Sequence, residues 1–197
     1  MNLQTLFRPA PSRSSRANLL WTAAQSVVIW VLLLGVVPAV LLMAERRIGL
    51  QGFHFPLQSI IGIGLFLLFS ALNVTTGYIL AARGKGTPLP TACPRALVIS
   101  GPYRYVRNPM AVAGIGQGIA VGLMLGSWMV IAYAAAGAVL WHFLLRPAEE
   151  RHLVSRFDDA YGEYRREVPL WWPRTNAYVR SDGTDSSGES KAAIQNL

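Results

Sequence analysis

The chain is poor in cysteine, in charge and in acidic residues. Its one cysteine, Cys93, excludes an intrachain disulfide and provides no set of metal ligands. Only 14% of the 197 residues are charged, whereas 52% are hydrophobic. The hydrophobic residues occur in long uncharged runs, and such runs favour a membrane protein over a soluble one.

Three stretches contain no Asp, Glu, Lys or Arg: residues 19–43, 57–82 and 110–145. In a helix that rises about 1.5 Å per residue, each of the first two covers the roughly 30 Å hydrocarbon core of a bilayer. The third is too long for one span and contains a candidate tight turn at 125–128. We therefore expect an all-α integral membrane bundle of four transmembrane helices, at about 19–43, 57–82, 109–126 and 128–146.

Two features of these spans allow more than one interpretation. Four polar residues near the end of the second span, Asn73, Thr75, Thr76 and Tyr78, either face a cavity or form hydrogen bonds between helices. Glycines recur every four residues in the third span and form a smooth stripe that allows close approach of another helix. That helix belongs either to the hairpin formed by the third and fourth spans or to a second protomer. The glycines are Gly114, Gly118, Gly122 and Gly126.

The segments outside the spans are polar. Residues 1–18 and 175–197 are predicted to be disordered, which leaves a membrane domain over residues 19–174. Residues 148–168 place apolar side chains at helical spacing between charges and predict a C-terminal amphipathic helix at the cytoplasmic surface. The two tryptophans in Pro-Leu-Trp-Trp-Pro (169–173) suit the headgroup layer.

The positive charges orient the bundle. Lys and Arg number three before the first span, two in loop 45–56, five in loop 83–108, none in the 126–128 turn and eight after Leu145. With four spans the basic segments fall on one side, so both termini are expected in the cytoplasm. The formal charge of +8 therefore reflects membrane orientation, and no nucleic-acid partner is expected.

Polar clusters lie at both cytoplasmic ends of the predicted hairpin, in residues 103–109 and 146–150. Charges so close to hydrocarbon are costly unless they are paired or hydrated, which favours a binding site. The structural alternative is a set of interface anchors with an Arg–Glu pair at the helix end. As a site, the clusters offer cations for a carboxylate and carboxylates for an ammonium group. The relevant residues are Arg104, Arg107, Arg146, Glu149 and Glu150, with His142 one turn deeper than Arg146 as either a packing or a catalytic residue.

Several motifs together resemble the isoprenylcysteine carboxyl methyltransferase family, whose superfamily includes membrane phospholipid N-methyltransferases. The resemblance covers about residues 57–174, and its motifs are specific in combination. It implies a multi-helix membrane methyltransferase that uses S-adenosyl-L-methionine at the cytoplasmic face. The motifs are Gly-Lys-Gly-Thr-Pro (84–88), Leu-Val-Ile-Ser-Gly-Pro-Tyr-Arg-Tyr-Val-Arg-Asn-Pro-Met (97–110), Glu149-Glu150, Phe157 with Tyr161 and Tyr164, and Pro-Leu-Trp-Trp-Pro-Arg (169–174).

The resemblance also implies roles for single residues. Arg146 falls where eukaryotic members place an arginine that orients the substrate carboxylate. In place of the family's usual Arg-His-Pro-x-Tyr, this chain has Asn108, which forms hydrogen bonds but does not titrate as His does, and Ala111, which lacks the phenol. The implied cofactor contacts are Arg95, Ala96, Leu97, Val98, Tyr103, Asn108, Glu149 and Glu150.

The acceptor of the methyl group stays open. A carboxylate acceptor, as in isoprenylcysteine O-methylation, needs no general base and is favoured, with Arg146 to hold it. A phospholipid amine must first lose a proton, for which His142 and Glu149 are candidates; a thiol is a third possibility. A membrane reductase using a nicotinamide cofactor and a non-catalytic scaffold are alternatives from other classes. The compact length is similar to that of prokaryotic members, which implies an inner-membrane protein with a lipophilic acceptor and lipid neighbours, and without metal.

Overall fold

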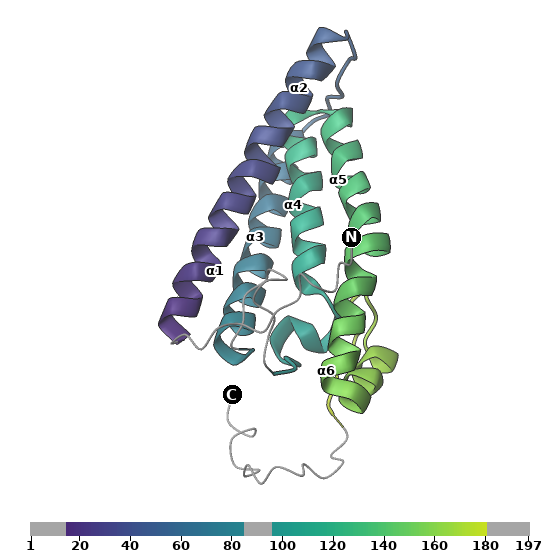
Figure 1. Ribbon diagram of the computed structural model, residues 1–197. Helices are drawn as coiled ribbons and strands as arrows, with labels where there is room; N and C mark the ends of the chain where they lie inside the picture. Colours follow the sequence, from purple (N-terminus) through teal and green to yellow (C-terminus); the bar gives the residue numbers. More distant parts are fainter. Residues whose placement is uncertain (1–14, 85–95, 181–197) are drawn as a thin grey trace.

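The computed structural model describes residues 15–84 and 96–180, and every regular element in these ranges is a helix (Figure 1). The first helical rod consists of α1 (Ser15–Trp30), the π-helical turn η2 (Val31–Val36) and α2 (Val37–Arg47). Pro38, at the start of α2, has no N–H to continue the helical hydrogen bonding. The wider π turn just before it accommodates this interruption within one continuous rod.

The elements that follow α2 along the chain are all helical as well. α3 (Gln58–Arg83) is followed by the short 3-10 helix η4 (Gly101–Arg104), by α4 (Pro109–Leu125) and by α5 (Trp128–Leu140). The π turn η5 (Trp141–Leu145) joins α5 to α6 (Arg146–Glu167). Within residues 15–84 and 96–180, three helices are long and apolar enough to cross a membrane: Ala23–Arg47, Gln58–Arg83 and Trp128–Glu167. α4 is apolar but shorter, with 17 residues, so the predicted count of four spans stays a prediction.

The predicted separate helix at 148–168 differs from the structure. The backbone instead continues from α5 through η5 into α6, and helical geometry is interrupted at Asp158, with φ 42° and ψ −123°. The helix that begins at Trp128 is about 45 Å long where it reaches the kink at Asp158, which already exceeds the roughly 30 Å hydrocarbon thickness. Its uncharged part ends at Leu145, so the charged part, α6, extends beyond the membrane-spanning segment.

The predicted boundaries of the disordered ends are also shifted. α1 begins at Ser15, so residues 15–18 are helical, while residues 1–14 and 181–197 lie outside the described residues. At the other end, residues 175–180 are not part of a free tail, because the Tyr178 side chain is only 5% exposed. The Tyr178 N–H donates to the carbonyl oxygen of Arg104 at 2.9 Å.

α4 lies between α3 and α5, and its glycines account for the close packing on both sides (Figure 1). A Cβ on Gly118 would meet the Cβ of Ala134 in α5 at 3.1 Å, and one on Gly122 would meet Ile131 at 2.6 Å. Two glycines of the predicted stripe thus serve the α4–α5 hairpin. A Cβ on Gly116 would meet the Phe69 ring of α3 at 2.6 Å, so a glycine outside that stripe is needed for the other contact.

Hydrogen bonds join α3 and α4 within the apolar region. The fully buried Gln117 donates through Nε2 to Ser70 Oγ at 2.9 Å and accepts through Oε1 from Asn73 Nδ2 at 3.1 Å. Thr76 Oγ1 donates back to the Leu72 carbonyl at 2.8 Å. Of the two interpretations open for Asn73 and Thr76, the structure therefore shows hydrogen bonding in and between helices, which satisfies groups that would be costly in lipid.

The α4–α5 turn is tied to the loop between α2 and α3. Glu45, at the end of α2 and 2% exposed, accepts hydrogen bonds from Ser127 Oγ and, at 3.1 Å, from the Trp128 N–H. A carboxylate at the first turn of α5 suits the positive end of the helix dipole. Gln58 Nε2 donates to the Leu123 carbonyl at 2.7 Å. Figure 1 shows this end of the bundle at the top. We call it the outer end because it lies farther from α6, and we call the end at α6 the inner end.

Candidate functional site

The loop at 96–108 is held at the entrance of α4 by the C-terminal segment 168–180, here called the strap. Three backbone N–H groups bond across the two segments: Arg107 to Pro169 at 3.0 Å, Arg174 to Tyr105 at 3.0 Å and Tyr178 to Arg104 at 2.9 Å. The residue numbers rise along one segment as they fall along the other, so the two run antiparallel. Arg104 Nε also donates to the Tyr178 carbonyl at 2.8 Å, which makes Arg104 a strap contact.

An aromatic cluster lies where α6, the strap and this loop meet. Its buried members are Tyr161, Tyr164, Val168 and Tyr178, and Leu97 and Ile99 of the loop pack against it. The Tyr164 hydroxyl donates to the Tyr103 carbonyl at 2.6 Å. The packing of Leu97 into this cluster gives it a structural use beside the cofactor contact that the motif implies.

Asn108 connects the start of α4 to α6. Its Oδ1 accepts from the Ala111 N–H at 3.0 Å, which caps the helix. Because Oδ1 is engaged there, its Nδ2 faces the other way and donates to Glu149 Oε2 at 3.3 Å. Two residues expected to lie together, 41 positions apart, are thus brought into contact.

The two adjacent carboxylates of α6 have different surroundings. Glu150 is paired through Oε1 with Arg107 Nη1 at 3.1 Å and through Oε2 with Arg165 Nη2 at 3.6 Å. Glu149 is contacted through Oε2 by the neutral Asn108 amide. Burial, and then the nearby charge of Glu150, raise the pKa of the Glu149 carboxyl to about 7. Burial and Glu149 likewise raise the pKa of the Tyr103 phenol above its ordinary value.

Buried polar atoms without a partner gather in the same segments. Within the described residues, Arg146 Nε, Arg107 Nε and Ser100 Oγ are buried and have no hydrogen-bond partner. The expected alternative of an Arg146–Glu150 pair is not what is found, because Glu150 pairs with Arg107 and Arg165 instead. Buried donors are normally satisfied, so these three atoms are the natural points of contact for a ligand.

His142 lies against the strap. Its Nδ1 accepts a hydrogen bond from Trp171 Nε1 at 3.1 Å, and the two rings stack with centroids 5.8 Å apart. Trp141 meets the same indole edge-on at 5.4 Å. His142 is therefore engaged by a residue for which the sequence had suggested only a place in the headgroup layer.

The other predicted site residues are placed as follows. Ala96 is exposed, Val98 is half-buried, Tyr103 is buried, and Arg95 lies outside the described residues. The sequence did not suggest a role for Arg165, Trp171 or Ser100. The available signals were the motif at 169–174, which contains Trp171, and the motif at 97–110, which contains Ser100. In the described ranges no three His, Cys, Asp or Glu residues are grouped so that they could hold a metal ion.

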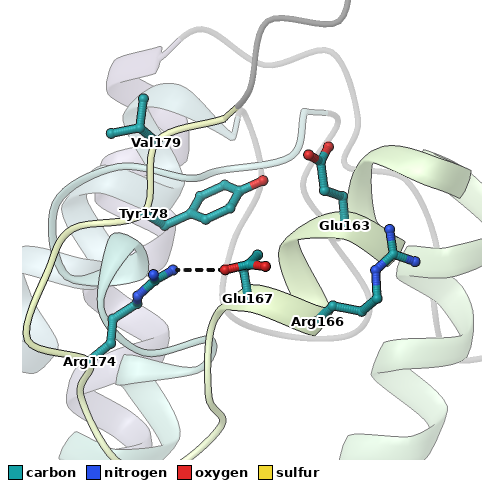
Figure 2. Close-up of a pocket in the computed structure, with 6 residues that line it drawn as sticks. All are labelled: Glu163, Arg166, Glu167, Arg174, Tyr178 and Val179. Carbon is teal, nitrogen blue, oxygen red and sulfur yellow. Dashed lines mark ion pairs between the residues drawn. The ribbon is translucent and has the colours of Figure 1, made fainter.

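A separate hollow of about 320 Å³ lies between α6 and the strap. Figure 2 shows the residues that line it, which are Glu163, Arg166, Glu167, Arg174, Tyr178 and Val179. Arg174 and Glu167 form an ion pair of 3.8 Å across it. None of the residues predicted for the site lines this hollow. The Asn108–Glu149 contact, rather than this hollow, is the candidate functional site.

The chain is similar to known proteins over less than half of its length. It is 36% identical over 79 residues to the protein-S-isoprenylcysteine O-methyltransferase of Schizosaccharomyces pombe, a match that covers 39% of this chain and 33% of the relative. It is also 34% identical over 82 residues to the cobalt-zinc-cadmium resistance protein CzcN of Cupriavidus metallidurans (42% and 38% covered). The nickel-cobalt-cadmium resistance protein NccN of Alcaligenes xylosoxydans xylosoxydans is 33% identical over 89 residues (45% and 40% covered).

These matches cover only about a third to two fifths of the curated relatives, so they bear on a shared segment and not on whole proteins. The sequence profile that describes the phospholipid methyltransferases extends further and matches residues 57–160. That range includes α3, α4, α5 and most of α6, and with them Asn108, Arg146 and the two carboxylates. Since it covers more than half of the chain, this integral membrane protein belongs to the phospholipid methyltransferase family.

Proposed function

We propose that this protein is an S-adenosyl-L-methionine-dependent methyltransferase acting on a lipophilic acceptor, with carboxyl O-methylation of the isoprenylcysteine type favoured. The observation that carries the proposal is the contact between Asn108 and Glu149. It joins the entrance of α4 to α6 beside buried Arg atoms that have no partner in the described ranges. Membership of a methyltransferase family supports the reaction class.

The residues present suit such a cofactor. Glu149 has an oxygen not used by Asn108 and would hold an ammonium or a sulfonium, while Arg107 Nε and Ser100 Oγ would serve polar groups. Three residues of the loop at 96–108 would contact the cofactor: Ala96, Val98 and Tyr103. Glu150 would contribute indirectly, because it holds Arg107. When bound, S-adenosyl-L-methionine supplies a methyl group on a positively charged sulfur. The protein's own task is then to align the acceptor and exclude water.

Arg146 is the proposed acceptor-binding residue. It follows directly on Phe143, Leu144 and Leu145, which are 68%, 52% and 40% exposed and suit contact with lipid. An acceptor with an apolar tail and a carboxylate head would place the tail there and the head on the guanidinium, which forms charge-assisted hydrogen bonds with carboxylates. A carboxylate needs no base.

The same proposal includes the arrangement in the membrane. α4 lies between two helices that are long enough to span and is about 25 Å long, so we propose it as a fourth span. The basic segments then place both termini and the site on the cytoplasmic side of a prokaryotic inner membrane.

A phospholipid amine is the second candidate acceptor, and a specific observation favours it. An ammonium group must lose a proton before it can be methylated, and Glu149, whose pKa is raised to about 7, is suited to take one. Methylation assays with a prenylcysteine analogue and, separately, with phosphatidylethanolamine as the acceptor distinguish the two candidates.

The first test is calorimetric titration of the detergent-purified protein with S-adenosylmethionine and S-adenosylhomocysteine, with NADPH as a control ligand. We expect saturable binding of the first two and a loss of at least tenfold in S-adenosylmethionine affinity in Glu149→Gln, because hydrogen bonds to charged groups contribute about 1.5–3 kcal/mol. Glu167→Gln, an exposed carboxylate on the same helix, is the matched control and should bind normally. A folded sample that binds neither cofactor form would refute the proposal, and NADPH binding would favour a reductase.

A further inference from the structure

We infer that Trp171 is a positioning residue that holds His142 in the tautomer with its proton on Nε2. His142 then offers a hydrogen-bond donor, and not a base, beside Arg146. The tautomer follows from the structure alone, whereas its consequence for the acceptor depends on the proposed function. Trp171 acts through His142 and is assigned no contact with a substrate.

The tautomer follows from the donor inventory of the two side chains. An indole N–H can only donate, so the Nδ1 that Trp171 Nε1 approaches at 3.1 Å must carry a lone pair. A neutral imidazole has one proton, which must then reside on Nε2. Among the described residues, Nε2 has no hydrogen-bond partner. It remains available to bind an acceptor.

Trp171 is held in place by groups on several sides. The strap is bonded to the loop on both sides of it, through the Pro169 carbonyl to the Arg107 N–H and through the Arg174 N–H to the Tyr105 carbonyl, both at 3.0 Å. The edge-on contact with Trp141 and the stacking on His142, inclined by 25°, orient the ring itself.

The helix also presents His142 in an unusual way. Trp141 and His142 begin the π turn η5, which ends immediately before Arg146. π turns are rare in proteins, and those that do occur are often found at functional sites. Here the turn places two consecutive aromatic side chains against one indole and directly precedes the residue proposed to bind the acceptor.

This arrangement has a consequence for the choice of acceptor. To act as a base, neutral His142 would need its Nδ1 lone pair, which Trp171 occupies. An acceptor that arrives ionised, such as a carboxylate, instead receives hydrogen bonds from both Nε2–H and Arg146. An amine acceptor would have to lose its proton to another group, and Glu149 is the candidate. Trp171 thereby makes the site selective for acceptors that need no base at His142.

The direct test is nuclear magnetic resonance of the detergent-solubilised protein with nitrogen-15 in its histidine rings. The chain has 3 His residues, and His142→Gln identifies the signal of interest. We expect long-range proton–nitrogen correlations to show Nδ1 unprotonated and Nε2 protonated. Trp171→Phe, which keeps an aromatic ring but removes the donor, should give a mixture of tautomers. Trp172→Phe is the matched control, since that side chain is 80% exposed, and should leave the signal unchanged.

A proton on Nδ1 in the parent protein would overturn the inference, as would a Trp171→Phe signal identical to that of the parent. If Trp171→Phe does not fold, the parent spectrum still decides. Because this experiment uses neither cofactor nor acceptor, it is independent of whether the protein methylates anything.

A second measurement tests the role in turnover with the prenylcysteine acceptor. His142→Gln retains an amide N–H and should keep kcat/KM within about threefold, whereas His142→Leu should lose about tenfold or more, as expected for a hydrogen bond to a charged group. Equal losses in both variants would contradict a donor role.

Discussion

The two ends of the helical bundle differ in whether their buried polar groups have hydrogen-bond partners. At the outer end, Glu45 accepts from Ser127 and Trp128, and the Ser127 hydroxyl accepts in turn from the Val130 N–H at 3.2 Å. Gln58 uses both of its amide atoms, accepting from the Phe55 N–H at 3.1 Å and donating to Leu123. The Glu45 contacts and the Gln58–Leu123 contact join distant segments, and the other two bonds satisfy groups within one segment.

At the inner end, some buried groups are left without partners. Glu150 is paired on both oxygens, yet Arg107 Nε, Arg146 Nε and Ser100 Oγ are buried with no partner within the described ranges. An unsatisfied buried polar group costs about 1–3 kcal/mol. Such a cost is typical of a site that completes its hydrogen bonds with a ligand. The comparison thus distinguishes an end whose described polar contacts are all internal from the end that carries the proposed site.

Glu150→Ala should have the largest effect on stability. It removes the carboxylate that pairs with the buried Arg107 and leaves that guanidinium uncompensated, which costs about 3–5 kcal/mol for a buried pair. Thermal unfolding in detergent, followed by circular dichroism, measures the loss. A melting temperature equal to that of the parent would show that the pair does not hold the loop at 96–108 to α6.

Glu45→Ala should cost less, about 2 kcal/mol, because Ser127 and Trp128 lose a hydrogen-bond acceptor but no buried cation is left without its counter-charge. The same thermal melt measures it. At a temperature where the variant is folded, its affinity for S-adenosylmethionine should equal that of the parent. A specific loss of affinity without a loss of stability would contradict the assignment of the outer end as structural.

The smallest expected effect is a dependence of cofactor binding on pH. With a pKa of about 7, Glu149 is mostly protonated at pH 6 and mostly ionised at pH 8, so affinity for a cation should be up to about tenfold greater at pH 8. The stability of the ligand-free protein should change with pH in the opposite direction to the cofactor affinity. A carboxyl whose pKa is raised on folding stabilises the ligand-free protein at low pH, and this contribution is lost as pH rises through 7.

Calorimetry across this range checks the prediction, and Glu149→Gln should flatten the profile. A parent profile that is flat from pH 6 to pH 8 would indicate that Glu149 does not face the bound cation.

The sequence predicted local features well and contacts between distant parts of the chain poorly. The positions of α3 and α4 were predicted to within one residue, at Gln58–Arg83 and Pro109–Leu125, because uncharged runs and a proline at the helix start are local signals. The hairpin predicted that residues 103–109 and 146–150 lie at the same end of the bundle, but it did not predict that Asn108 bonds to Glu149. Helical spacing suggested Arg146 as the partner of Glu150, but the partner is Arg107, 43 positions earlier.

The amino-acid sequence was sufficient for the membrane class, the apolar helices and the polar residues of the family motifs, because hydropathy and helix propensity act over one or two turns. The three-dimensional packing was needed to show that Glu150 forms ion pairs whereas Glu149 is contacted by a neutral amide, and that Trp171 donates to Nδ1 of His142. Those relations depend on where the strap crosses the loop at 96–108. Contacts between distant segments arise when the whole chain packs, and no local pattern encodes which side chain then reaches a given atom.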